Sequence, residues 1–208
     1  MDRETETPQT RDPELTRSRI LAAATELFVD KGFADVAMRE IAERSQVTKS
    51  LIHHHFGSKE QLWDAVKTAS FESYARAQKA ALEEASEANR DLLISSVTAY
   101  FQFLKDHPDC VRLYAWTHLE GDTESGHRMD RELVALGARR VAEAQQRGLL
   151  RGDVNPTHVV ALFVHACTHW FEARSHHADW PGIGSDEEYL EDFLKVFMEG
   201  LLSREPEN

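Results

Sequence analysis

The hydrophobic residues of this chain recur every three or four positions, the spacing that places side chains on one face of an α-helix. The first clear segment of this kind contains Ile20, Ala24, Leu27 and Phe28. The last contains Tyr189, Phe193, Phe197 and Leu201. No segment alternates apolar and polar residues in the manner of a half-buried strand. The pattern therefore predicts an all-α protein.

Capping signals divide the chain into separate helices. Asp12-Pro13 and Asn155-Pro156 each combine an N-cap residue with a proline at the first helical position. Residues 58–61 and 185–188 have the spacing of a capping box, in which the first and fourth side chains bond each other's backbone amides. Gly32 stands where the first helix can end in a left-handed residue.

Residues 38–56 are predicted to form a short helix, a tight turn and a second short helix. The residues predicted to pack these helices together are Ile41, Ala42, Val47 and Ile52. The residues predicted to face outward are Thr48, Lys49, Ser50, His53 and His54. Their polar groups have suitable reach for phosphates and base edges. A helix-turn-helix needs this build, because its second helix must fit the major groove while the first braces it.

The charge of the chain is unevenly distributed. The sequence has 208 residues, 41% of them hydrophobic, which is enough for a sizeable core, and its net charge is −12. Such a charge argues against a generic nucleic-acid binder. Residues 11–60 carry eight basic and eight acidic side chains, so the excess lies elsewhere. A locally basic element on an acidic body can still bind phosphates, and the body then weakens nonspecific binding.

Nothing in the sequence indicates export or membrane insertion. Residues 1–8 are polar and acidic and lack the apolar core of a signal peptide, and residues 1–11 are expected to form a disordered tail. The longest apolar run, residues 159–164, is too short to span a bilayer. Cys110 and Cys167 form no CxxC motif and imply no disulfide framework. We therefore expect a cytoplasmic protein without a membrane partner.

Residues 17–62 resemble the DNA-binding domain of the TetR family. The matching text is RSRILAAATELFVDKGF, then MREIAERSQVTKS, then LIHHHFGSKEQLW. The resemblance implies a helix-turn-helix DNA-binding domain over residues 12–60 and a helical ligand-binding and dimerisation domain over residues 61–208. It also implies a transcription regulator rather than an enzyme: a repressor that binds a palindromic double-stranded operator and responds to a small molecule.

The resemblance assigns DNA contacts to Thr48, Lys49, Ser50, His53, His54 and Lys59. The sequence also departs from the family pattern. Ala37 stands where a capping Thr or Ser is usual, so that Asp35 is a substitute cap, and Gln46 stands where the turn usually has Gly. A residue other than glycine is unfavourable there if its φ is positive. Tyrosine is common at the positions of His53 and His54, and histidine makes a phosphate contact depend on pH.

The resemblance further implies an effector site and a dimer interface in the C-terminal domain. The residues that we expect to line the effector site are Phe101, Leu113, Trp116, Thr117, Cys167 and Trp170. Aromatic walls of this kind, without a glycine-rich phosphate cradle, favour a small apolar or aromatic effector and no cofactor, although the same residues are also typical of plain core. The expected homodimer interface is residues 155–171 and 186–202, where Tyr189, Phe193, Phe197 and Leu201 would leave an apolar patch on a monomer.

Two other functions remain open at this point. His165 and His169 lie four residues apart, a spacing that can hold a metal ion in a metal-binding helical protein or a metal-sensing regulator. The same stripe can equally lie at a dimer seam or a pocket wall. The other possibility is a helical adaptor that has lost DNA binding. There is no HExxH motif and no paired nucleophile and base, so nothing supports an enzyme.

Overall fold

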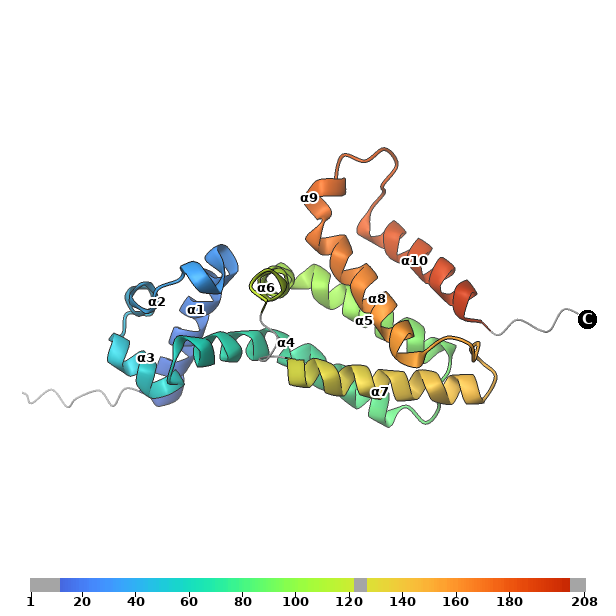
Figure 1. Cartoon of the computed structure of the whole chain (residues 1–208), viewed down its shortest axis with the longest axis horizontal. Helices are drawn as coiled ribbons and strands as arrows, with labels where there is room; N and C mark the ends of the chain where they lie inside the picture. Colours follow the sequence, from blue (N-terminus) through green and yellow to red (C-terminus); the bar gives the residue numbers. More distant parts are fainter. Residues whose placement is uncertain (1–11, 122–126, 203–208) are drawn as a thin grey trace, which may run out of the picture. The chain divides into compact units, whose positions relative to one another are not determined.

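A computed structural model describes residues 12–121 and 127–202 of the chain (Figure 1). The described residues are helical throughout apart from turns, caps and one isolated antiparallel bridge between Leu150 and Leu202. This confirms the all-α prediction. The tail expected over residues 1–11 lies outside the described residues. None of the described helices is long and apolar enough to cross a membrane.

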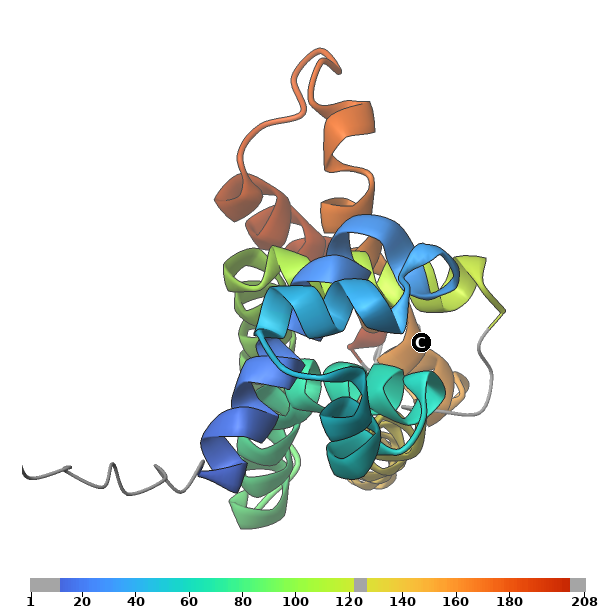
Figure 2. The ribbon, with the colours of Figure 1, turned by 90° about the vertical axis from the view of Figure 1, so that its left-hand side faces the viewer.

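The chain divides into two compact units, the first of which ends at Lys67. It contains α1 (Pro13–Asp35), α2 (Met38–Ser45), α3 (Lys49–Phe56) and the beginning of α4 (Lys59–Glu84), seen from a second direction in Figure 2. Its core residues are Ile20, Phe28, Ile41, Ile52, Leu62 and Trp63. They come from all of these helices, so the first unit is built around a core of its own.

Local sequence signals set the ends of these helices. Asp12 Oδ1 accepts a hydrogen bond of 2.9 Å from the amide of Glu14 at the start of α1. Gly32 has a φ of 77° and interrupts the helical geometry of α1, which resumes for a last turn. Ser58 and Gln61 form the predicted capping box at the start of α4, with bonds of 3.0 and 3.2 Å.

The second unit begins at Thr68, within α4. Its further helices are α5 (Arg90–Asp106), α6 (Pro108–Leu119), α7 (His127–Gln146), α8 (Pro156–Glu172), α9 (Arg174–His177) and α10 (Asp186–Leu201). The predicted caps at Asn155 and Ser185 are present: the Asn155 side chain accepts from Thr157 N, and Ser185 forms a capping box with Glu188. α8 packs against α5, α6 and α7, which makes it the central helix of this unit.

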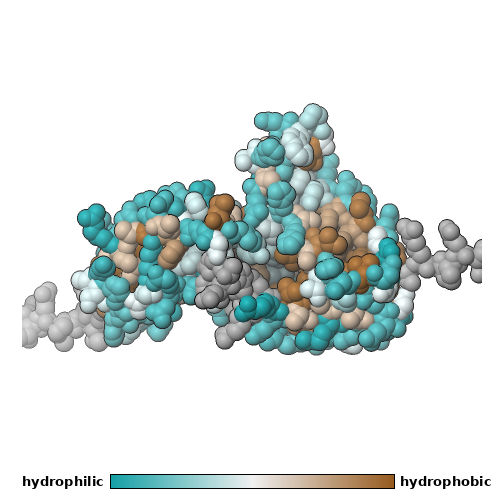
Figure 3. Space-filling model, in the orientation of Figure 1, coloured by the Kyte–Doolittle hydropathy of each residue, from teal (hydrophilic) through white to brown (hydrophobic). Residues whose placement is uncertain are grey.

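The aromatic stripe of α10 packs into the core of its own chain. Phe197 and Leu201 are buried, and the partly buried Tyr189 stacks on Trp170 with 3.9 Å between ring centroids. The expectation that this stripe leaves an exposed patch is therefore wrong, because α8 and α5 already cover it. The exposed apolar residues of these helices are Leu162 on α8, with 57% of its surface exposed, and Val196 on α10, with 73%. Figure 3 shows hydrophobic residues gathered over α8 and α10.

Candidate nucleic-acid interface and cavity

The turn between α2 and α3 is held from α1. Gln46 has a φ of 56°, the left-handed conformation that favours glycine and costs another residue about 1 kcal/mol or more. Arg19 donates hydrogen bonds to Gln46 Oε1 at 3.0 Å and to the carbonyl of Ser45 at 2.9 Å. Gln46 stands where the family pattern usually has glycine. The hydrogen bonds from Arg19 stabilise the turn despite this residue.

The start of α2 uses a carboxylate inside the helix instead of an N-cap side chain. Glu40 accepts from the amide of Ala37 at 2.9 Å and from Lys31 Nζ at 2.7 Å. These two hydrogen bonds hold the pKa of Glu40 below its ordinary value. Asp35 is the last residue of α1 and does not cap α2, so the expected substitute cap is wrong: Glu40, from the first turn of α2, satisfies the free backbone amide instead.

α3 presents a polar surface outward. Its buried residues, Ile52 and Phe56, face the core of the first unit, while Thr48 Oγ1 accepts from the amide of Leu51 and starts the helix. The exposed residues are Thr48, Lys49, Ser50, His53 and His54. Five of the six positions assigned to DNA contacts therefore lie together at an exposed surface, beginning at the positive end of the helix dipole.

The basic residues near this surface differ in how they are bound. On α2, Arg39 lies 3.5 Å from Glu43, and Arg44 pairs with Glu26. Lys49, on α3, makes no hydrogen bond or ion pair with any part of the chain that the structure describes. Its ammonium group is thus the most available cation of the surface.

His53 and Lys59 are bound within the first unit. His53 Nδ1 lies 2.5 Å from the carbonyl oxygen of Gly57, which can only accept, so Nδ1 carries the proton. The outward nitrogen Nε2 then becomes a donor only in the imidazolium form. Lys59, the sixth assigned position, is half-buried, donates to the carbonyl of Ala34 at 3.2 Å and lies 4.4 Å from the ring centroid of Phe33.

The second unit contains a partly open cavity of about 140 Å³. Helices α4 to α8 all contribute to its wall, which is mainly aromatic and aliphatic. Its aromatic residues are Phe71, Tyr74, Tyr100, Phe103, Tyr114 and Phe163. An engineered apolar cavity of about 150 Å³ binds benzene, so this space accommodates a small organic molecule.

None of the six residues expected to line an effector site lines this cavity. Phe101 packs against Phe171, with ring centroids 4.8 Å apart, and Cys167 is buried in the core. Leu113 and Thr117 are buried on α6, with Trp116 half-buried beside them. α5 has buried residues on more than one side, and the cavity lies on the side of Tyr100 and Phe103 rather than of Phe101. Helical spacing alone does not distinguish these sides.

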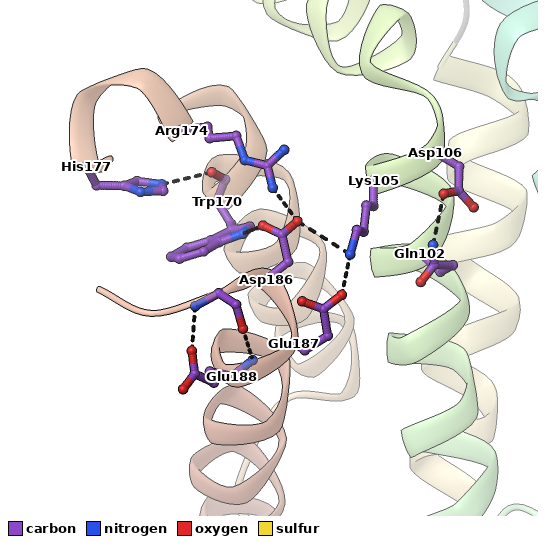
Figure 4. A network of polar contacts seen from close by, with 10 residues as sticks. Gln102, Lys105, Asp106, Trp170, Arg174, His177, Asp186, Glu187 and Glu188 are labelled. Atoms are coloured by element: carbon purple, nitrogen blue, oxygen red, sulfur yellow. Dashed lines mark hydrogen bonds and ion pairs between the residues drawn. The ribbon is translucent and has the colours of Figure 1, made fainter. Parts of the chain in front are cut away.

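Trp170, the remaining residue of the six, belongs to a polar network that joins α5, α8, α9 and α10 (Figure 4). Its indole Nε1 donates to Asp186 Oδ1 at 2.9 Å, and Arg174 pairs with Oδ2 of the same carboxylate. Lys105 Nζ on α5 lies 3.6 Å from Asp186 Oδ2 and also binds Glu187. Burial opposes ionisation of Asp186, but the bonds from Arg174 and Trp170 outweigh it and hold its pKa below the ordinary value. Trp170 thus anchors α10 to α8.

His165 and His169 are both exposed on α8. His169 Nδ1 lies 3.9 Å from a carboxylate oxygen of Glu172, on the same helix. Within residues 12–121 and 127–202, no group of three or more His, Cys, Asp or Glu side chains is arranged to hold a metal ion.

The geometry defines the class of protein. A helix-turn-helix with an exposed second helix, followed by a helical unit that contains an apolar cavity, is the architecture of a helix-turn-helix transcription regulator. Two family profiles match the chain: bacterial regulatory proteins of the tetR family over residues 20–66, and the tetracyclin repressor-like C-terminal domain over residues 91–188. The chain belongs to the TetR family, whose members are transcription regulators and not enzymes.

Individual relatives include both activators and repressors. The transcriptional activator FasR of Mycolicibacterium smegmatis is 35% identical over 97 residues, which are 47% of this chain and 44% of FasR. The transcriptional repressor NicS of Pseudomonas putida is 27% identical over 171 residues, with 77% of each chain covered. A tetR-family regulatory protein from Rhodococcus has the same fold, with a TM-score of 0.72 at 19% identity over 91% of this chain and 98% of its own.

Proposed function

We propose that this protein is a homodimeric transcriptional repressor that binds a palindromic operator and is released by a small, largely apolar effector. The observation that carries the DNA-binding part is the exposed polar surface of α3, held by a turn that Arg19 braces. The relative NicS is named a repressor, which supports that direction of control. Such a repressor acts on chromosomal DNA and hence in the cytoplasm.

In the proposed complex, α3 enters the major groove. Lys49 neutralises a phosphate, and Thr48 donates its hydroxyl hydrogen to another. Ser50 reaches a base edge, where it contributes to sequence choice. His53 and His54 donate to phosphates in their imidazolium forms. Lys59 keeps its bond to Ala34 and adds a phosphate contact through its remaining N–H groups.

The proposed dimer is formed by residues 155–171 and 186–202. The support for this interface is the pair of exposed apolar residues Leu162 and Val196 on α8 and α10, because apolar surface of this kind is stabilised when a second copy covers it. A twofold dimer places two copies of α3 in successive major grooves, about 34 Å apart, which requires a palindromic site.

The proposed effector site is the cavity of the second unit. Its walls are mostly apolar, and five helices contribute to it, so a molecule bound there contacts most of the unit at once. A ligand shifts the balance between DNA-binding and released forms only by its different affinity for the two.

Fluorescence anisotropy tests the DNA-binding proposal. The probe is labelled DNA from the region flanking the protein's own gene, and the control is scrambled DNA of equal length and composition. We expect selective binding to the flanking DNA and a dimeric mass by light scattering at micromolar concentration. Equal affinity for both probes, or a monomer, contradicts the proposal. Expression of a reporter under the control of the same region should rise when the gene for this protein is deleted. If the protein were an activator, reporter expression would fall.

A further inference from the structure

The cavity wall contains a side-chain amide that makes no hydrogen bond within the described part of the chain. α4 contributes Phe71, Tyr74, Gln78 and Leu82, which follow one another at helical spacing along the cavity. Gln78 is only 7% exposed, and its side chain makes no hydrogen bond within the described part of the chain. The hydroxyl of Tyr74, one turn earlier, likewise has no hydrogen-bond partner among the described residues. No fully buried side-chain nitrogen or oxygen of the described residues lacks a partner, so the polar atoms of Gln78 and Tyr74 remain accessible to a molecule in the cavity.

Most other polar groups of the wall already have partners. Tyr100 Oη lies 2.8 Å from Thr168 Oγ1. Ser96 Oγ donates to the carbonyl of Leu92 at 2.7 Å, and Cys110 Sγ lies 3.0 Å from the carbonyl oxygen of Ser70. On α4, by contrast, the side chains of Gln78 and Tyr74 line the cavity and make no hydrogen bond within the described part of the chain.

Of the described residues that line the cavity, one is charged, Arg140 on α7, and its guanidinium already has partners. Its guanidinium donates to the carbonyl oxygens of Leu82 and Ala85, at the end of α4, and to Glu143 Oε2 at 2.9 Å. Among the residues that the structure describes, no carboxylate lines the cavity. A cation would lose its hydration without meeting an opposite charge, and an anion would meet only Arg140, which already bonds these carbonyls and Glu143, so either charge is costly in this apolar site.

We propose that the cavity selects a neutral, largely apolar molecule that carries one amide, carbonyl or hydroxyl group, and that Gln78 and Tyr74 bind this polar group. The proposal rests on the proposed function in that it takes this cavity to be the effector site. Gln78 offers both a donor and an acceptor, so an amide on the ligand can form a reciprocal pair with it. The ligand thereby supplies the partner that the folded chain leaves out.

Four compounds on one scaffold test the charge and the polar group separately. They are biphenyl, biphenyl-4-carboxamide, biphenyl-4-carboxylate and biphenyl-4-ylmethylammonium. Binding to the full-length protein without DNA is measured by calorimetry and by thermal shift. We expect the carboxamide to bind at least tenfold more tightly than either ion, and more tightly than biphenyl. Tighter binding of the carboxylate or the ammonium compound, or no binding of any of the four at their solubility limits, overturns the proposal.

Substitutions at the two residues locate the contact. Gln78→Leu, which keeps a similar volume, should weaken carboxamide binding about threefold to tenfold, as expected for one lost hydrogen bond, and leave biphenyl binding equal or tighter. Tyr74→Phe should have a smaller effect in the same direction. The matched control is Gln146→Leu, at an exposed position of α7, which should leave all four affinities unchanged. Unchanged carboxamide affinity in Gln78→Leu rules the assignment out.

A parallel DNA-binding measurement separates this inference from the proposed function. If the carboxamide binds through Gln78 but leaves operator affinity unchanged, the ligand class stands and the effector role fails. If operator binding responds only to organic anions or cations, regulation by an effector stands and the ligand class proposed here fails.

Discussion

The two units place their candidate functional residues in opposite ways. In the first unit five of these residues lie on α3 or at its N-cap and are exposed, and the sixth, the half-buried Lys59, begins α4. In the second unit the cavity residues come from α4 to α8, over a span of 94 residues from Phe71 to Val164, and most are buried. A surface made by one short helix follows from local spacing, whereas a cavity made by five helices depends on how they pack.

The comparison also explains why Phe101 and Tyr100 have different roles although they are neighbours. Both are buried, and both are aromatic. Tyr100 lines the cavity, while Phe101 packs against Phe171 on α8 and Tyr189 on α10. Adjacent helical residues point about 100° apart, so they reach different neighbours.

The largest expected effect is that of Phe101→Ala, which tests whether Phe101 is core. Loss of a buried phenyl ring should lower the free energy of unfolding by about 3–5 kcal/mol and the melting temperature by roughly 10 °C. Denaturant unfolding with circular dichroism measures this. Leu119→Ala, at an exposed position of α6, is the control and should change stability little. A stable Phe101→Ala protein with weakened ligand binding would return Phe101 to the effector site.

Asp186→Asn should have the next largest effect. The amide keeps the shape but loses the ion pairs with Arg174 and Lys105, so stability near neutral pH should fall by about 1–3 kcal/mol. The folded-state pKa is lowered, so the stabilisation by ionised Asp186 is present above the unfolded-state pKa and is lost as pH falls through the folded-state value. The free energy of unfolding, measured from about pH 6 to pH 2, should therefore fall less steeply with decreasing pH in the variant than in the natural protein. An unchanged slope would contradict the network's role.

Gln46→Gly tests whether the turn is strained. Glycine adopts the φ of 56° without a steric penalty, so relief of the strain should stabilise the first unit by up to about 1 kcal/mol. Loss of the hydrogen bond from Arg19 to the Gln46 side chain offsets part of this gain. Thermal unfolding of Gln46→Gly and of Gln46→Ala gives the comparison. Alanine keeps the strain and loses the Arg19 bond, so it should be less stable than the natural protein. Equal stability of the two variants would mean that this φ costs nothing.

Lys49→Ala should have the smallest effect in free energy and the most specific signature. We expect affinity to fall severalfold for all DNA sequences, and the slope of log affinity against log salt concentration to lose about one unit. Lys59→Ala should show the same signature together with reduced stability, because Lys59 also binds Ala34 and Phe33. Anisotropy titrations at several salt concentrations measure both. Unchanged salt slopes in both variants would remove these lysines from the interface.

Much of the fold was predictable because helices begin at local signals. The caps at Asp12, Ser58, Asn155 and Ser185 all act as expected, since each bonds an amide within three residues of itself. The expected substitute cap at Asp35 does not form: Asp35 is the last residue of α1, and the amide of Ala37 donates to Glu40, which also binds Lys31. This arrangement depends on Lys31 of α1, which the local capping pattern does not include.

The sequence by itself determined the helical class, the family and the exposed surface of α3, because periodicity, caps and a short motif act over a few residues. Tertiary structure decided which aromatic residues surround the cavity, and it covered the stripe of Tyr189, Phe193, Phe197 and Leu201 within the chain. It also placed Gln78 at the cavity wall without a hydrogen-bond partner among the described residues, while Asp186 received three partners. Such differences depend on which helix faces meet across long sequence separations, and hydrophobic spacing shows that a face is buried without showing what it is buried against.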